Sequence, residues 1–132
     1  MRSLKQEEVI GDLLELEPDR WALSMLQTRK DMAFRHTDLV WDHYIYSQAS
    51  SVAIAVVQAD MVIVSSMRCN YKAHARVGDV LTARAKVGIH KGDKYIVSVR
   101  TRVASEEIFV GRFIVSAIDA GERMFPERSA SL

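Results

Sequence analysis

The stretch DLVWDHYIYSQASSVAIAV, residues 38–56, decides the fold of this chain of 132 residues. Its second half alternates β-branched and small side chains, which is compatible with a strand. Length favours a helix instead, because fifteen residues from His43 to Val57 pass without a Gly or a Pro, and Asp42 is a suitable N-cap. We therefore predict one long helix over this segment.

The composition of this helix indicates where it lies in the fold. Small side chains on several sides allow a sheet to approach closely, so we expect strands to wrap around the helix. The polar residues of its first half are unusual for a core helix, and they are candidates for a functional site: Asp42, His43, Gln48, Ser50 and Ser51.

The second half of the chain predicts strands, because apolar and polar residues alternate along it. Gly and Asp in the segment His90–Lys94 mark a turn between two such runs, and Ala104–Glu107 marks another. Four consecutive antiparallel strands in a curved meander are expected. They cover Met61–Tyr71, the run that starts at Val80, Tyr95–Val103 and Ile108–Ala117.

The segment Val9–Thr28 breaks at Glu17-Pro18-Asp19, a turn signal with apolar runs on both sides. A hairpin and a helix followed by a strand both fit this pattern. The predicted fold class is α+β, with a curved antiparallel sheet wrapped around one long central helix. We expect a single domain over residues 1–119, and a polar tail over residues 120–132 that is disordered.

The overall amino-acid composition limits which partners and which cellular locations are expected. Lys and Arg together number 18 and Asp and Glu number 17, so a net charge of +1 provides no overall field toward nucleic acid or anionic lipid. The single Cys69 cannot form an internal disulfide, which suits a reducing compartment. No run of about 18 apolar residues is present, and the first residues are too charged for a signal peptide. These features predict a cytoplasmic protein that does not enter a membrane.

Four segments carry a resemblance to a known family. They read EEVIGDLLELEPDRWALSMLQ, HYIYSQASSVAIAV, GDVLTARAKV and EEIFVGRF, at residues 7–27, 43–56, 78–87 and 106–113. In order and spacing they resemble the ligand-binding domain of the FapR family, malonyl-CoA-responsive repressors of bacterial lipid-synthesis genes. The resemblance implies a hotdog fold and a homodimer whose sheets join edge to edge, with acyl-CoA in a channel at the interface.

The chain departs from that family in two ways. FapR proteins carry an amino-terminal helix-turn-helix, and this chain contains no DNA-reading element, so DNA is expected as a partner only through such a segment. The family's Arg-Gly-His before the helix and Gln-Ala-Asn-Ser within it correspond here to Trp41-Asp42-His43 and Gln48-Ala49-Ser50-Ser51. Compared with the family, this chain lacks the Arg and the Asn and carries an additional Asp. All three changes oppose binding of the second carboxylate of a malonyl group. Arg35 or His36 could restore positive charge.

The candidate ligand-binding residues follow from this resemblance and from the polar stretch. They are Phe34, Arg35, Trp41, Asp42, His43, Tyr46, Gln48 and Ser50. Asp42 could activate water for thioester hydrolysis or serve only as a helix cap. Tyr46 and Trp41 could line an acyl channel or pack against the sheet. Arg84, Arg100 and Arg102 could contact CoA phosphates or form a solvated sheet face.

Three functions remain open at this point. The first is a binding module for an acyl-CoA or acyl carrier protein thioester, and the second is an acyl-CoA thioesterase that uses Asp42. The third is a scaffold that only dimerises. Scattered His residues and the absence of a Cys pair predict no metal site, and the absence of a Gly-rich phosphate loop predicts no bound cofactor.

Overall fold

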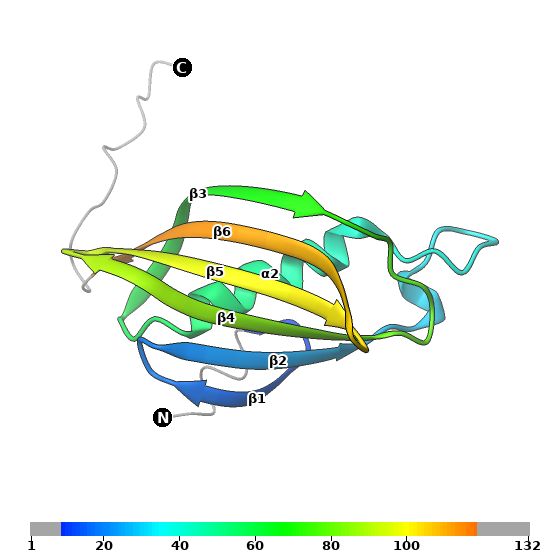
Figure 1. Cartoon of the computed structure of the whole chain (residues 1–132), viewed down its shortest axis with the longest axis horizontal. Coiled ribbons are helices and arrows are strands. Elements are labelled where there is room, and N and C mark those ends of the chain that lie inside the picture. The colour runs from blue at the N-terminus through cyan, green and yellow to red at the C-terminus, as the bar shows by residue number, and fades with distance from the viewer. Residues whose placement is uncertain (1–8, 119–132) are drawn as a thin grey trace, which may run out of the picture.

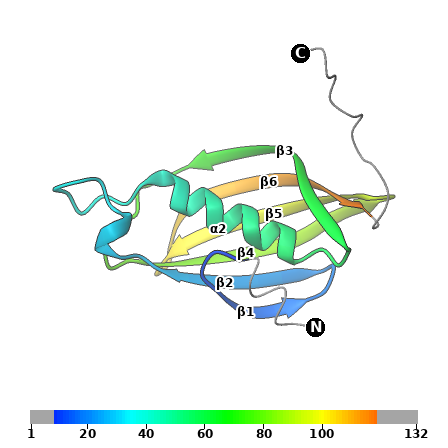
Figure 2. The same cartoon turned by 180° about the vertical axis from the view of Figure 1, so that it is seen from behind.

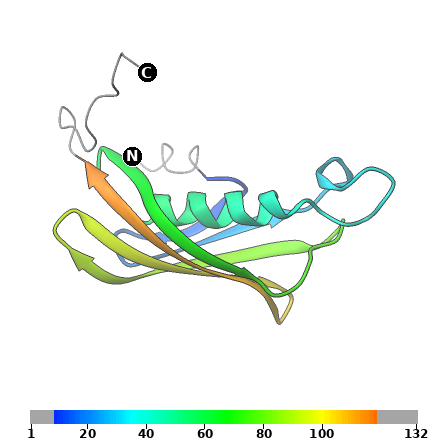
Figure 3. The ribbon, with the colours of Figure 1, turned by 90° about the horizontal axis from the view of Figure 1, so that it is seen from above.

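The computed structural model describes residues 9–118 as a curved, six-stranded antiparallel sheet wrapped around one helix (Figure 1). Figure 2 shows the helix lying across one face of the sheet, and Figure 3 shows the sheet curving beneath it. This arrangement confirms the predicted α+β hotdog fold. The elements are β1 (Asp12–Glu17), β2 (Trp21–Gln27), the 3-10 helix η1 (Lys30–Met32), α2 (Asp42–Ala55), β3 (Met61–Tyr71), β4 (Val80–Lys91), β5 (Lys94–Val103) and β6 (Glu106–Ile118).

The strands lie in the order β1-β2-β4-β5-β6-β3. β4, β5 and β6 form the predicted meander, but β3 pairs with β6, so the prediction that four consecutive strands lie side by side is wrong for β3. Residues 72–79 cannot form a hairpin because they are bound elsewhere. The N–H of Val40 donates to the carbonyl of Ala75 at 2.8 Å, and the N–H of Val77 donates to the carbonyl of Asp38 at 2.8 Å. These bonds carry the chain across the end of the sheet.

The first described segment is the hairpin β1–β2, which settles the alternative left open by the sequence. Its turn contains Asp19, which has a positive φ of 62°. The Asp19 N–H donates to the carbonyl of Val56 at 2.7 Å, and the Asp19 carboxylate accepts from the N–H of Gln58 at 2.9 Å. The turn therefore supplies polar partners to the end of α2, where carbonyls have no partner within the helix. The tail predicted for residues 120–132 lies outside the described residues.

The central helix begins one residue before the predicted start and ends two residues before the predicted end. Asp42 is not the N-cap, which corrects the prediction. Trp41 occupies that position because its N–H donates to the carbonyl of Met32 at 2.9 Å and holds it in an extended conformation. Asp42 is the first helical residue, where a carboxylate still interacts favourably with the positive end of the helix dipole.

Small residues bring the helix and the sheet into close contact. Ala49, Ala53 and Ala55 of α2 are fully buried, as are Ala83 and Ala85 of β4. The helix contacts every strand from β2 to β6. The two largest fully buried side chains, Phe109 and Phe113 of β6, complete the core.

Gly111 makes the packing of these two rings possible. It lies between Phe109 and Phe113 on the inner face of β6, and a Cβ at this position would lie 2.7 Å from the ring of Phe113 and 3.1 Å from that of Phe109. Distances this short require the rings to move within a packed core, where little free space is available.

We expect Gly111→Ala to lower the free energy of unfolding by about 1–3 kcal/mol, because it overpacks the core. The measurement is the urea midpoint of unfolding. Gly88→Ala is the matched control, since its Cβ would meet only the carbonyl of Ile96 at 3.7 Å. Equal losses for the two substitutions would contradict the proposed packing role of Gly111.

Candidate functional site

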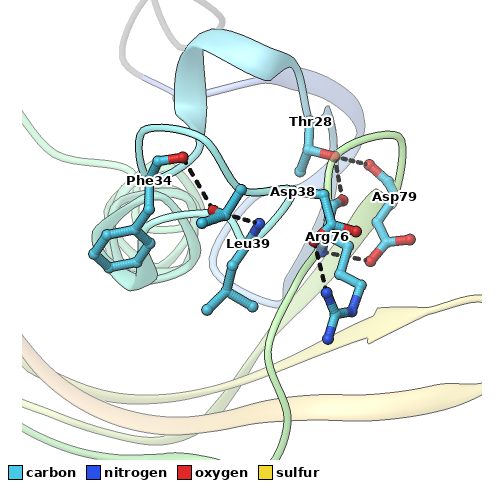
Figure 4. Close-up of polar contacts among 7 residues, drawn as sticks. Thr28, Phe34, Asp38, Leu39, Arg76 and Asp79 are labelled. Carbon is cyan, nitrogen blue, oxygen red and sulfur yellow. Dashed lines mark hydrogen bonds and ion pairs between the residues drawn. The ribbon is translucent and has the colours of Figure 1, made fainter.

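The segment between β2 and α2 is held rigidly at one end of the sheet (Figure 4). The Thr28 hydroxyl lies 2.9 Å from the carbonyl oxygen of Arg76 and 2.7 Å from that of Asp79, to which it can donate. The Asp79 carboxylate in turn accepts from the N–H of Arg76 at 2.8 Å. These contacts join the start of the segment to the connection between β3 and β4.

The tip of this segment is a tight loop. The Phe34 N–H donates to the carbonyl of Leu39 at 2.9 Å, and the Thr37 hydroxyl donates to the carbonyl of Phe34 at 3.0 Å. The Arg76 guanidinium donates to the Asp38 carboxylate at 2.7 Å, as Figure 4 shows. Phe34 therefore lies on a loop whose backbone is held by hydrogen bonds within the chain.

Aromatic rings form a continuous exposed surface beside this loop. The Phe34 and Trp41 rings stack with centroids 3.7 Å apart, Trp41 lies 5.8 Å from His43, and His43 lies 4.6 Å from Tyr44. Trp41 is 41% exposed and Phe34 is 37% exposed. We call these four residues the aromatic surface. Exposed apolar groups that are held in place are typical of binding sites.

A groove of about 420 Å³ begins at Tyr44, the innermost member of the aromatic surface. Its size lies within the range of small-molecule sites. Periodicity could not reveal this groove, because its residues come from separate parts of the chain. It is lined by Val9, Ile10, Gly11, Asp12, Met25, Leu26, Gln27, Arg29, Met32 and Tyr44.

Asp42 lies next to the aromatic surface and faces His74. The His74 Nδ1 is 3.7 Å from the Asp42 carboxylate, and both side chains are about half exposed. Burial, followed by the negative charge of Asp42, raises the pKa of Tyr71 above its ordinary value. Sequence reasoning gave no specific role to His74 or Tyr71, and the only signal for His74 was its place in a basic stretch after a strand.

The polar residues further along α2 serve the fold. Gln48 is fully buried, and its Nε2 donates to the Ser24 hydroxyl and to the carbonyl of Leu81, each at 3.1 Å. The Ser51 hydroxyl donates to the carbonyl of Gln48 at 3.0 Å and accepts from the N–H of Ile10 at 3.0 Å. Gln48 therefore bonds the helix to β2 and β4, and a contact of this residue with a ligand stays a prediction.

The other predicted ligand residues are dispersed. Tyr46 is half buried with its ring 6.1 Å from that of Phe113, so it packs toward the sheet. Ser50 is half buried on α2, and Arg35 is exposed on the loop. The structure thus brings Phe34, Trp41, Asp42 and His43 together and leaves Tyr46 and Gln48 in the packing between helix and sheet.

The predicted phosphate ligands lie on the other face of the sheet. Arg84, Arg100 and Arg102 are exposed, whereas their strand neighbours Ala83, Ala85, Val99 and Thr101 are buried beneath α2. These arginines therefore point away from the helix. Contact with CoA phosphates at this face stays a prediction.

The carboxylate of Glu107 lies close to three cations on that face. It lies 2.6 Å from the Lys72 ammonium, 2.8 Å from the Arg100 guanidinium and 3.7 Å from the Arg102 guanidinium. Hydrogen bonds from Lys72 and then Arg100 lower the pKa of Glu107 from 4.5 to about 2. Both donors are cations, so their hydrogen bonds and their charges lower the pKa of Glu107 in the same direction.

Neither a metal centre nor a membrane helix is found in residues 9–118. No group of three or more His, Cys, Asp or Glu side chains there could hold a metal ion. No helix in the same range is long and apolar enough to cross a membrane.

Residues 38–106, from the loop through α2 to β6, match the thioesterase superfamily. The chain belongs to this superfamily. It is 39% identical over 119 residues to transcription factor FapR of Thermoanaerobacter sp. strain X514, and 32% identical over 114 residues to transcription factor FapR of Geobacillus thermodenitrificans. These matches cover 90% and 86% of this chain but 60% and 58% of the relatives, so the chain spans about three fifths of their length.

Solved structures share the same fold. An uncharacterized protein from Pyrococcus horikoshii superimposes with a TM-score of 0.81 at 23% identity, covering 89% of this chain and 90% of the other. A hypothetical thioesterase from Streptococcus pneumoniae, solved with coenzyme A, gives a TM-score of 0.74 at 10% identity and covers 89% and 94% of the two chains. At such identities the likeness establishes the fold alone.

We expect Glu107→Gln to change how stability depends on pH. A carboxyl group whose pKa falls on folding stabilises the fold above its ordinary pKa, near 4.5, and loses that contribution as the pH falls toward about 2. The urea midpoint of the original chain should therefore fall across this window by more than that of the variant. Glu106→Gln, at an exposed neighbouring position, is the matched control. Parallel profiles for the original chain and Glu107→Gln would contradict the assignment.

Proposed function

We propose that this domain binds an acyl thioester, carried on CoA or on an acyl carrier protein, and acts as the effector domain of a FapR-like regulator. The observation that carries the proposal is the exposed aromatic surface, which connects through Tyr44 to a groove of about 420 Å³. Membership of the thioesterase superfamily and the similarity to FapR transcription factors support this function.

The geometry suggests how such a ligand would bind. Trp41 and Phe34 offer a flat, partly desolvated surface for the thioester and its pantetheine arm, and the groove offers Met25, Leu26 and Met32 to an acyl chain. Since the loop is already held by internal hydrogen bonds, little conformational entropy would be lost on binding.

The charges next to the aromatic surface disfavour an acyl group with a second carboxylate. Asp42 is an anion, and the nearby Arg76 is engaged with Asp38 at 2.7 Å. Burying a carboxylate needs cations or several donors to offset its desolvation. We therefore propose that an uncharged acyl group binds more tightly than a malonyl group, unless Arg35 contacts the second carboxylate.

Thioester hydrolysis is the second candidate function, because Asp42 lies 3.7 Å from His74 and is about half exposed. In this mechanism the Asp42 carboxylate takes a proton from water as the water oxygen attacks the thioester carbonyl, and His74 orients Asp42. The C–S bond then breaks, and the departing CoA sulfur takes the proton held by Asp42, which leaves a carboxylic acid and regenerates the Asp42 carboxylate.

Dimerisation is proposed through β3. This strand of 11 residues is an edge of the sheet, and Met61, Met67 and Tyr71 on it are exposed. The opposite edge, β1, has only 6 residues and carries Asp12, Glu15 and Glu17. Short, charged edges resist pairing with another strand, whereas long apolar edges favour it.

We expect isothermal titration calorimetry to detect binding of at least one ligand among acetyl-, butyryl-, octanoyl- and malonyl-CoA. Trp41→Ala should weaken that binding roughly tenfold, because an aromatic contact surface is removed. Ile89→Ala is the matched control, since Ile89 is an exposed aliphatic residue outside the aromatic surface and the groove.

Failure of every CoA ester to bind would refute the proposed function. If Trp41→Ala leaves the affinity unchanged, the ligand does not bind at the aromatic surface. Thiol release measured in the same samples tests hydrolysis. If turnover is lost in Asp42→Asn while binding persists, the domain is a thioesterase that uses Asp42 and not a sensor.

We expect Met67→Lys to convert a dimer into a monomer in sedimentation velocity, because the lysine would introduce a charge into a β3–β3 interface. Leu14→Lys is the matched control on the other edge strand, where Leu14 is similarly exposed, 50% against 47% for Met67. A dimer that persists in Met67→Lys but dissociates in Leu14→Lys would place the interface at β1.

A further inference from the structure

The face of the sheet opposite α2 carries arginines in direct register. Arg84 of β4 lies opposite Arg100 of β5, and Arg68 of β3 lies opposite Arg112 of β6. Like charges at such positions are about 5 Å apart at their Cβ atoms and destabilise a sheet unless an anion lies between them. Two such pairs on one face are therefore costly to the isolated domain.

Carboxylates do not neutralise this face. Glu107 is the only acidic residue that β3–β6 direct among these cations in the described part of the chain, and it is already shared by Lys72, Arg100 and Arg102. Arg84 lies over the ring of Trp21 at 5.9 Å. In residues 9–118, no carboxylate pairs with Arg68, Arg84, Lys86 or Arg112. We call Arg68, Arg84, Lys86, Arg100, Arg102 and Arg112 the cationic face.

Two depressions mark the arginine pairs. One of about 300 Å³ is lined by Arg84, Arg100, Arg102, Leu23 and Thr82, and the other, of about 380 Å³, is lined by Arg68, Arg112, Ser66, Met67 and Ile114. The pairs are two strands apart, which corresponds to roughly 10 Å across a sheet. Arg100 and Arg112 lie on neighbouring strands, so a single phosphate can contact one member of each pair, whereas a chain of repeating anions can contact all four arginines.

The net charge of +1 does not reveal that cations and carboxylates are unevenly distributed over the sheet. The carboxylates Asp12, Glu15 and Glu17 lie on β1, on the same face as Arg84 and Lys86 but at the far edge of the sheet from β5, β6 and β3. The expectation from composition, that no overall field attracts nucleic acid, averages over strands that lie at different distances from these carboxylates. A local patch can bind a polyanion regardless of the net charge of the chain.

We propose that the cationic face binds the phosphate backbone of nucleic acid. Five of its six cations are arginines, whose planar guanidinium donates two parallel hydrogen bonds to a phosphate. Phosphates recur every 3.4 Å along the axis of each DNA strand, so several fall within the span of the two pairs.

The spacing of the arginine pairs favours nucleic acid over an acidic protein, because phosphates recur at a fixed interval along each strand of nucleic acid. The proposed contacts are with the phosphate backbone, which carries no sequence information, so we expect binding to be independent of sequence. This proposal does not rest on acyl-thioester binding.

The experiment is fluorescence anisotropy of a labelled DNA duplex of arbitrary sequence, titrated with the whole chain over a range of salt concentrations. Binding should weaken linearly on a double-logarithmic salt plot. Arg84→Gln/Arg112→Gln should reduce the slope by about two, because each lost phosphate contact releases one counterion fewer. Arg20→Gln/Lys30→Gln is the matched control, since it removes the same charge from exposed positions outside β3–β6 and should leave the slope unchanged.

Four outcomes would overturn the proposal. They are no binding at low salt, an equal change of slope in the control, tighter binding of poly-L-glutamate than of DNA, and displacement of the duplex by stoichiometric CoA. The third would assign the face to an acidic protein, and the fourth to a small phosphorylated ligand. Thermal unfolding followed by circular dichroism verifies that both double variants are folded.

Discussion

The close packing of α2 into the concave face of the sheet is the constraint on which the rest of the structure depends. Alanines on both sides of this contact let the backbones approach, and the space that remains is filled by Phe109 and Phe113 around Gly111. Because the helix is fixed in this way, its first turn lies at one end of the sheet. The loop that presents Phe34 and the connection that contains Arg76 meet it there.

Much of the fold follows from periodicity. Alternation along residues 80–117 gave the three strands of the meander, and the length of the segment after Asp42 gave the helix. The partner of β3 could not be predicted, since it depends on bonds between residues 72–79 and a distant loop. The first hairpin stayed ambiguous because Pro18 permits a turn between strands or after a helix. Asp42 is not the N-cap because a backbone bond to Met32 holds Trp41 there.

The candidate site was predictable only in part. Phe34, Trp41, Asp42 and His43 do lie together, but their stacking depends on a loop whose shape no local pattern encodes. Gln48 has the same polarity as a ligand-binding residue and instead bonds to two strands. The cationic face could not be predicted for a different reason: composition sums all charges, whereas the strand order places the carboxylates of β1 at one edge of the sheet and most of the arginines on β5, β6 and β3.

Gln48 also limits how the central helix can move. Its amide is bonded to Ser24 of β2 and to the carbonyl of Leu81 of β4, in the middle of α2, and its Oε1 is buried without a partner in the described structure. Rotation of the helix about its axis would break both bonds inside the core, which is costly where no water replaces them. Any displacement of α2 that keeps these bonds intact has to include β2 and β4, and through β2 it involves β1.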